Sequence, residues 1–163
     1  MQQASEQAGD LAQAMQDGCL GVRVGRLHRL VGRQFDQALR PLGLSISQME
    51  ILSALTLISG PVRPADLGTW LAIERSTMSR NLSLMEKKGL IAAAESSASG
   101  RSMSFVITEQ GTEALTQASA AWNGAQTGLL QLVGSDAAPT LDTWISQLTQ
   151  PSIGGVAVLL RSV

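Results

Sequence analysis

The sequence has few of the residues that most enzymes and metalloproteins use for chemistry. Its 163 residues include one cysteine, Cys19, one histidine, His28, no tyrosine and only 3% aromatic residues. A single cysteine excludes an internal disulfide and any multi-cysteine metal site, and a single histidine excludes a two-histidine metal motif. Neither a phosphate-binding glycine loop nor a nucleophile paired with histidine is recognisable. We therefore expect no metal, no cofactor and no enzymatic activity.

Long apolar runs are also missing from the sequence. No run approaches the roughly 18 residues that a membrane span needs, and the N-terminus lacks a basic-then-apolar signal pattern. With 44% hydrophobic and 15% charged residues, the chain has enough apolar side chains for a core, and its length suits one domain. We expect a folded, cytoplasmic protein that does not bind membranes.

Charge is unevenly distributed along a chain whose net charge is -1. Residues 19–40 contain five arginines and one aspartate, and residues 63–101 contain six basic and four acidic residues. The rest of the chain is acidic. A locally basic segment fits nucleic-acid binding through one face, although a solvated surface explains the same charges.

The first part of the sequence has the pattern of consecutive helices. Residues 1–18 are polar and rich in alanine and glutamine, so we expect an arm or a short helix. In residues 19–39 apolar side chains recur every three or four positions, which predicts an amphipathic helix. Ser47 and Glu50 have the spacing of a capping box and predict the start of the next helix, which ends at Gly60.

A short helix and a longer, polar-faced helix follow. Pro64 stands where a first helical turn tolerates proline, and a tight connection comes after about two turns. In residues 76–88 one face is apolar and the other is polar and basic, and Gly89 marks the helix end. The apolar face consists of Met78, Leu82 and Met85.

After Gly89 the hydrophobic period changes from helical to two. Residues 90–95 and 102–107 predict two strands joined by a small, flexible tip. Met103, Phe105 and Ile107 make one apolar face of the second strand. Thr108 caps a long helix with a coiled-coil-like apolar seam, and a further helix spans about residues 140–150 before an apolar tail.

The order of these elements over residues 47–107 is that of a winged helix-turn-helix. The fold class is therefore mainly α (α+β), with a two-stranded wing and flanking helices at both ends. A helix about 10–12 Å across fits the major groove of duplex DNA, and its exposed side chains bond phosphates and base edges. Arg101, beyond the flexible tip, suits the negative potential of the minor groove.

From Leu39 to Leu115 the chain resembles the MarR family of transcriptional regulators. The resemblance is carried by Leu42-Gly43-Leu44, Gln48, Ser76-Thr77-Met78-Ser79-Arg80, Glu86-Lys87-Lys88-Gly89-Leu90-Ile91, Arg101, Ile107-Thr108 and Gly111. It implies a homodimer built from the N- and C-terminal helices, a recognition helix in the major groove and a wing arginine in the minor groove. Arg80 matches the family's common base-contacting arginine and Arg101 its wing arginine. Ser99 departs from the pattern, because the family usually has an acidic residue there that helps to orient the wing arginine.

These arguments give two sets of candidate site residues and a division of the chain. We expect DNA contacts from Arg75, Ser76, Thr77, Ser79, Arg80, Ser83 and Arg101. We expect dimer contacts from Leu20, Val24, Leu27, Leu115, Trp122, Leu129 and Trp144. The division is an N-terminal arm (1–18), an N-terminal dimerisation helix (19–42), a winged helix-turn-helix domain (43–108), and C-terminal dimerisation helices with an apolar tail (109–163).

The leading functional hypothesis is a ligand-responsive, homodimeric repressor that binds a pseudo-palindromic operator in double-stranded DNA. The resemblance suggests a small aromatic or phenolic effector, which would enter the crevice between the dimerisation helices and the DNA-binding part. The alternative from another class is a helical protein-interaction module that does not bind DNA.

A cysteine-based redox sensor is a lesser variant of the leading hypothesis. Some MarR-like regulators sense oxidants through a cysteine at the start of the first long helix, and the matching position here is about Gly21, two residues from Cys19. The tyrosines that usually support such a cysteine are missing, and neither an arginine nor a histidine is adjacent to Cys19 in sequence.

Overall fold

The computed structural model describes residues 2–94 and 103–149, which form helices and one antiparallel hairpin. In chain order the elements are α1 (Gln2–Gly18), α2 (Leu20–Leu39), the 3-10 helix η1 (Arg40–Leu42), α3 (Ile46–Ile58), α4 (Pro64–Trp70), α5 (Arg75–Lys87), β1 (Ile91–Ala94), β2 (Ser104–Ile107), α6 (Glu109–Val133) and α7 (Ala137–Leu148). This order confirms the predicted winged helix-turn-helix with flanking helices.

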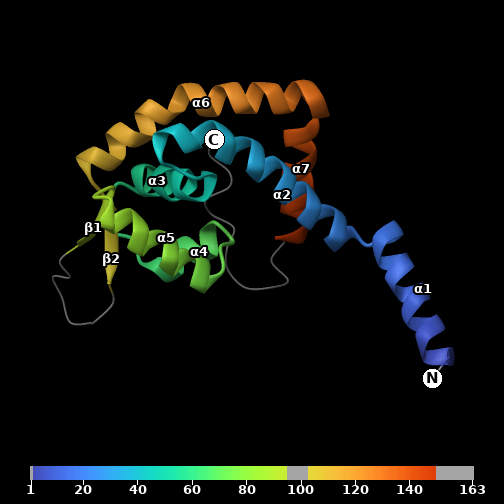
Figure 1. Ribbon diagram of the computed structural model, residues 1–163. Helices are drawn as coiled ribbons and strands as arrows, with labels where there is room; N and C mark the ends of the chain where they lie inside the picture. The colour runs from blue at the N-terminus through green and yellow to red at the C-terminus, as the bar shows by residue number, and fades with distance from the viewer. Residues whose placement is uncertain (1, 95–102, 150–163) are drawn as a thin grey trace.

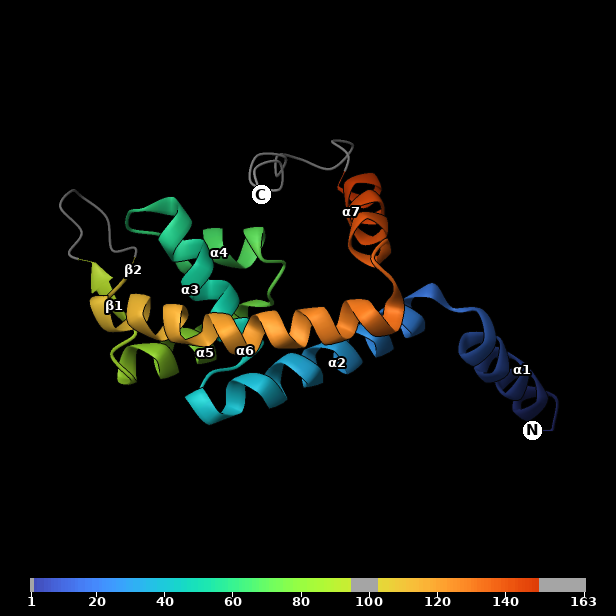
Figure 2. The same cartoon turned by 90° about the horizontal axis from the view of Figure 1, so that it is seen from above.

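Two long helices lie along one side of the winged helix-turn-helix elements. Figures 1 and 2 show α2 running beside α6, with α3, α4, α5 and the β1–β2 hairpin gathered near one end of this pair. At the other end α1 extends away from the rest of the chain, and α7 follows the end of α6. Within the described residues no single helix is long and apolar enough to cross a membrane. Residues Leu20–Leu42 and α3 reach that length and composition only as a pair, which is bent by 78°.

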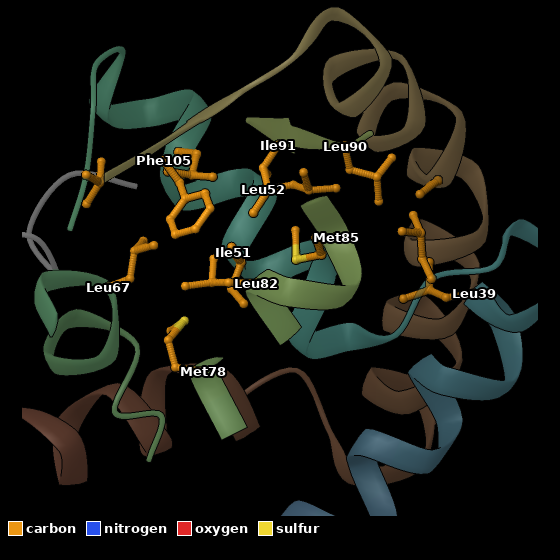
Figure 3. Packing of buried hydrophobic residues seen from close by; sticks show 14 of the residues in the cluster. Leu39, Ile51, Leu52, Leu67, Met78, Leu82, Met85, Leu90, Ile91 and Phe105 are labelled. Atoms are coloured by element: carbon orange, nitrogen blue, oxygen red, sulfur yellow. The ribbon is translucent and has the colours of Figure 1, made fainter. Parts of the chain in front are cut away.

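The hydrophobic core sits among α3, α5, the hairpin and the end of α2 (Figure 3). The three apolar side chains predicted to share one face of α5 are all buried, as are three from α3. These six are Met78, Leu82, Met85, Ile51, Leu52 and Leu55. Leu39, Leu67 and Phe105 close the core from α2, α4 and β2. Because one face of α5 is fully used by the core, its opposite face is left for solvent or a partner.

The start of α3 differs from the prediction by two residues. Ser45, not Ser47, is the N-cap: its hydroxyl accepts a hydrogen bond from the Gln48 N–H, and the Gln48 side chain accepts one from the Ser45 N–H, both at 3.3 Å. The Ile46 N–H also donates to Asp36 Oδ1 at 2.8 Å. The box at Ser47 is therefore wrong, because the helix starts two residues earlier, where the Asp36 carboxylate of α2 satisfies the free N–H of Ile46.

Other boundaries also differ from the prediction by one to three residues. The helix α5 begins at Arg75 rather than Ser76. The helix α7 begins at Ala137 and includes Pro139 as its third residue, which is allowed because N–H groups of a first turn have no intrahelical acceptor. Met103 is 63% exposed rather than part of the apolar face, because the paired strand starts at Ser104.

The hairpin is attached to the helices on both of its sides. Its antiparallel register pairs Ile91 with Ile107 and Ala94 with Ser104. Val62, between α3 and α4, forms a bridge with Phe105 through two backbone hydrogen bonds of 2.9 Å. The Thr108 N–H donates to the Leu90 carbonyl at 3.1 Å. These bonds fix the base of the wing relative to α4 and α6.

Candidate nucleic-acid interface

Six of the seven candidate DNA-contacting residues lie on α5, whose first turn is capped by Glu74. Its carboxylate accepts hydrogen bonds from the N–H groups of Ser76 (2.8 Å) and Thr77 (3.3 Å), and from the Ser76 hydroxyl. The Ser76 hydroxyl contributes most to lowering the pKa of Glu74 below its usual value, and the charge of Arg80 adds to it. The cap therefore stays ionised at neutral pH and sets where the helix begins.

One side of α5 is polar and open. Five of the six candidate residues on this helix are exposed and Thr77 is half-buried, while Met78, Leu82 and Met85 on the opposite side are buried. We call this set the α5 face. It consists of Arg75, Ser76, Thr77, Ser79, Arg80 and Ser83.

The guanidinium of Arg80 forms no salt bridge with a carboxylate of the described residues. Its Nε and Nη2 donate long hydrogen bonds to the Ser76 carbonyl (3.3 Å) and to Thr77 Oγ1 (3.4 Å). Both partners belong to its own helix, and bonds this long to neutral, exposed groups are weak. Among the described residues Arg80 forms no ion pair, so the guanidinium is available to an outside acceptor.

The α5 face borders a groove of about 970 Å³ between α4, α5 and β2. Arg75, Ser79 and Ser83 line it from α5. Arg63 lines it as well, but its Nε is held by Asp66 Oδ2 at 2.8 Å. That hydrogen bond raises the pKa of Arg63 and engages its charge locally.

Arg101 lies outside the residues that the structure describes, so its place in the wing stays a prediction. The same holds for the tip at residues 96–100 and for the tail after Pro151. The structure thus brings together the six α5 residues of the predicted set and leaves the seventh untested.

A second cavity, which we call the α3–α6 crevice, lies between α3, α4 and α6. Its volume is about 600 Å³. Most of its lining is apolar, with polar side chains only from α3 and α6. The lining residues are Ile46, Met49, Glu50, Ser53, Ala54, Leu57 and Ile58 of α3, Trp70 and Leu71, and Leu115, Ser119, Trp122 and Asn123 of α6. A cavity of this size and polarity is typical of sites for small organic ligands.

Glu50 is the one ionisable residue among the described lining residues of the crevice. Glu50 is exposed where it lines the crevice, but the side chains around its carboxylate still remove part of its water and raise its pKa, an effect that His28 on α2 opposes. Sequence reasoning used Glu50 only as a capping residue and missed this position.

The predicted dimer residues fall into two groups. Leu20, Val24, Leu27 and Trp144 are exposed, from 38% to 65% of their side chains. Leu115, Trp122 and Leu129 instead pack against the core of their own chain. The Trp122 ring stacks on Phe35 at a centroid distance of 6.4 Å. A role of all seven in a dimer stays a prediction.

Cys19 lies at the N-cap position of α2 and is half-buried. Among the described residues no group of three or more histidine, cysteine, aspartate or glutamate side chains is arranged to hold a metal ion.

Comparison with known proteins now decides the family. The MarR family model matches residues 42–102, which contain α3, α4, α5 and β1. The transcriptional regulator MosR of M. tuberculosis is 30% identical over 82% of this chain and 95% of its own, with a TM-score of 0.69. The chain belongs to the MarR family.

Other MarR-type structures agree with this fold. MosR in complex with DNA is 30% identical over 80% of this chain and 92% of its own, with a TM-score of 0.68. CouR from Rhodococcus jostii bound to p-coumaroyl-CoA is 17% identical over 88% of this chain and 99% of its own, with a TM-score of 0.69, so it shows the fold alone. A search of curated proteins finds no match. As a MarR-family member, the chain is a transcriptional regulator, and such regulators are typically not enzymes.

Two features of the interface were missed from the sequence. Glu74 caps α5, and Asp36 of α2 accepts the Ile46 N–H at the start of α3, beside the Ser45 cap; sequence spacing alone predicts neither contact. Glu74 had a weak signal, since an acidic residue just before the first turn of a helix can accept its free N–H groups. Asp36 had none, because it reaches Ile46 across the η1 turn.

Proposed function

We propose that this MarR-family protein is a homodimeric, ligand-responsive repressor that acts in the cytoplasm on a pseudo-palindromic operator. In this proposal α5 enters the major groove with the α5 face toward the bases and phosphates. Arg80 reads a base edge, and Arg101 enters the minor groove. The dimer places two α5 helices in successive major grooves, with half-sites about one helical turn apart.

The single observation that carries the proposal is the division of α5 into a buried and an open face. Met78, Leu82 and Met85 tie it to the core, while Arg75 and Arg80 are exposed and without carboxylate clamps among the described residues. A rigid helix that presents arginine and serine side chains to solvent suits duplex DNA, where arginine bonds guanine edges and hydroxyls bond phosphates. MosR, the relative 30% identical to this chain, has been solved in complex with DNA.

The α3–α6 crevice supports ligand control. It lies between α6, assigned here to the dimerisation part, and α3 and α4 of the DNA-binding part. A ligand that fits only one arrangement of these helices shifts the population toward it and so changes the spacing of the two α5 helices. CouR and an organohalide-sensing regulator have been solved with p-coumaroyl-CoA and 2,4-dichlorophenol bound, respectively. We therefore assign a small aromatic or phenolic effector to this crevice.

The test is a titration of the purified protein into labelled duplex from the region upstream of its own gene. The titration is repeated at several salt concentrations with unrelated DNA as competitor. We expect tight binding that resists the competitor and weakens steeply with salt, because phosphate contacts release counterions. The bound species should contain two chains for each operator.

Two results would contradict the proposal. The first is equal, weak binding to both DNAs at every salt concentration, together with no enriched sequence when binding fragments are selected from the whole genome. That result would mean that the protein has no specific operator. Absence of any DNA binding would favour the helical protein-interaction module instead.

A further inference from the structure

The α3–α6 crevice has an unusual charge balance for a ligand site. Nine of its thirteen lining residues are apolar, and Glu50 is the charged one. Among the residues that the structure describes, the lining contains no lysine, arginine or histidine. His28 on α2 acts on Glu50 from outside the lining.

This balance has a direct consequence for ligands. An anionic group placed in the crevice would lose water to an apolar lining and would find no cation to replace it. It would also lie near the exposed Glu50 carboxylate of the lining. The repulsion between two like charges about 4 Å apart lowers the affinity by about fivefold even in bulk water. The effect grows as the surroundings become less polar. A hydroxyl or an ammonium group avoids this repulsion, because each donates a hydrogen bond to a carboxylate.

We infer that the α3–α6 crevice binds aromatic ligands that carry no negative charge, and that Glu50 selects against anionic ones. The aromatic part of the ligand packs against Trp70 and Trp122, which line the crevice from α4 and α6. Glu50, on α3, receives the ligand's hydroxyl or ammonium group. The inference rests on the proposed effector role of the crevice and specifies its chemistry.

The experiment compares three probes of one shape by isothermal titration calorimetry without DNA. They are 4-phenylphenol, which is neutral, 4-phenylbenzylamine, which is cationic, and biphenyl-4-carboxylate, which is anionic. We expect the carboxylate to bind about tenfold more weakly than the phenol to the wild-type protein. Ser53→Phe, which fills the crevice from an exposed position, should weaken all three probes.

Glu50 is tested by two substitutions. In Glu50→Gln the affinity difference between the phenol and the carboxylate should fall to about twofold. In Glu50→Lys the carboxylate should bind more tightly than the phenol, because the charge at this position changes sign. Glu113→Gln is the matched control, since Glu113 is an exposed carboxylate of α6 outside the lining. It should leave the order of the three probes unchanged.

The possible results separate this inference from the proposed function. Equal or preferred binding of the carboxylate, or no binding of any probe, overturns the inference even where the operator titration succeeds. The inference is also overturned if Glu50→Gln keeps the wild-type affinity difference between the phenol and the carboxylate. A protein that discriminates among the probes but fails to bind DNA keeps the inference and loses the proposed function.

Discussion

At the residue scale, Arg80 is where specificity in DNA binding should be concentrated. Among the described residues its guanidinium donates hydrogen bonds to the Ser76 carbonyl and Thr77 Oγ1, both on its own helix, so little stabilisation is lost when it turns toward a base. We expect Arg80→Ala to weaken operator binding by about 1–3 kcal/mol and to reduce the preference for operator over unrelated DNA. Fluorescence anisotropy on both duplexes at one salt concentration measures this.

The control for Arg80 is the conservative variant Arg80→Lys. Lysine keeps the charge but not the two parallel donors that match a guanine edge, so non-specific binding should stay while discrimination falls. An equal loss of affinity on every DNA sequence in Arg80→Ala would instead assign Arg80 to a phosphate.

Gly111 is decisive for stability at the same scale. A Cβ built on it would lie 2.0 Å from the Leu90 carbonyl oxygen and 2.9 Å from Ile107 Cγ1. The Leu90 oxygen cannot yield easily, because it accepts the Thr108 N–H at the start of α6. We expect Gly111→Ala to lower the free energy of unfolding by about 3 kcal/mol, from overpacking at the base of the wing.

Urea denaturation at a fixed protein concentration tests the Gly111 prediction. Gly124→Ala is the matched control on the same helix, since nothing lies within 4 Å of its Cβ position. It should stabilise by up to about 1 kcal/mol through helix propensity alone. Similar effects of the two substitutions would mean that the close approach at Gly111 is unimportant.

At the element scale, the position of α5 depends on a charged cap. The pKa of Glu74 is lowered by the Ser76 hydroxyl and then by the backbone N–H groups of Ser76 and Thr77 and by Arg80. A carboxyl whose folded-state pKa is lowered adds stability above its unfolded pKa, and this stability is lost as pH falls through the folded value. We expect Glu74→Gln to lower the melting temperature slightly. The decrease should be about the same at every pH between 6 and 8, because a carboxyl group is fully ionised there in the folded and the unfolded protein. The difference from wild type should shrink below about pH 4.5.

Melting curves of both proteins across this pH range check the cap. A Glu113→Gln protein serves as control, because the hydrogen bond that this exposed carboxylate accepts among the described residues comes from the Gln117 side chain. A Glu74→Gln difference that persists unchanged at low pH would show that the charge of the cap is irrelevant.

Elements that are determined locally were predictable from the sequence, and contacts between elements were not. The face of α5 that holds Met78, Leu82 and Met85, and the end of that helix at Gly89, follow from helical spacing and from a glycine at φ +71°. The start of α3 does not, since Ser45 and Ser47 both begin a capping pattern and the choice depends on Asp36. The α3–α6 crevice is formed by α3 and α4 together with α6, which is far from them in sequence, so no sequence pattern shows that its lining residues come together.

At the scale of the whole molecule, the described chain leaves much apolar surface uncovered. Leu20, Val24 and Leu27 on α2 are exposed, and so are four large apolar residues on α7. The four on α7 are Leu141, Trp144, Ile145 and Leu148. A monomer rarely exposes so many large apolar side chains on two helices, which is why a second copy of the chain is expected there.

The dimer is tested by a charge placed in this apolar surface. Leu27→Glu buries an unpaired carboxylate if α2 lies in the dimer, so the dimer dissociation constant should rise by at least about tenfold. Sedimentation velocity over a range of concentrations measures it, with circular dichroism to confirm that the helices persist. Leu84→Glu is the matched control, because Leu84 is a similarly exposed leucine, 45% against 38%, on α5, which lies outside the predicted dimer helices. If Leu27→Glu and Leu84→Glu sediment alike, α2 is not part of the interface. If only Leu27→Glu dissociates and its operator affinity falls in proportion, two chains act together on DNA.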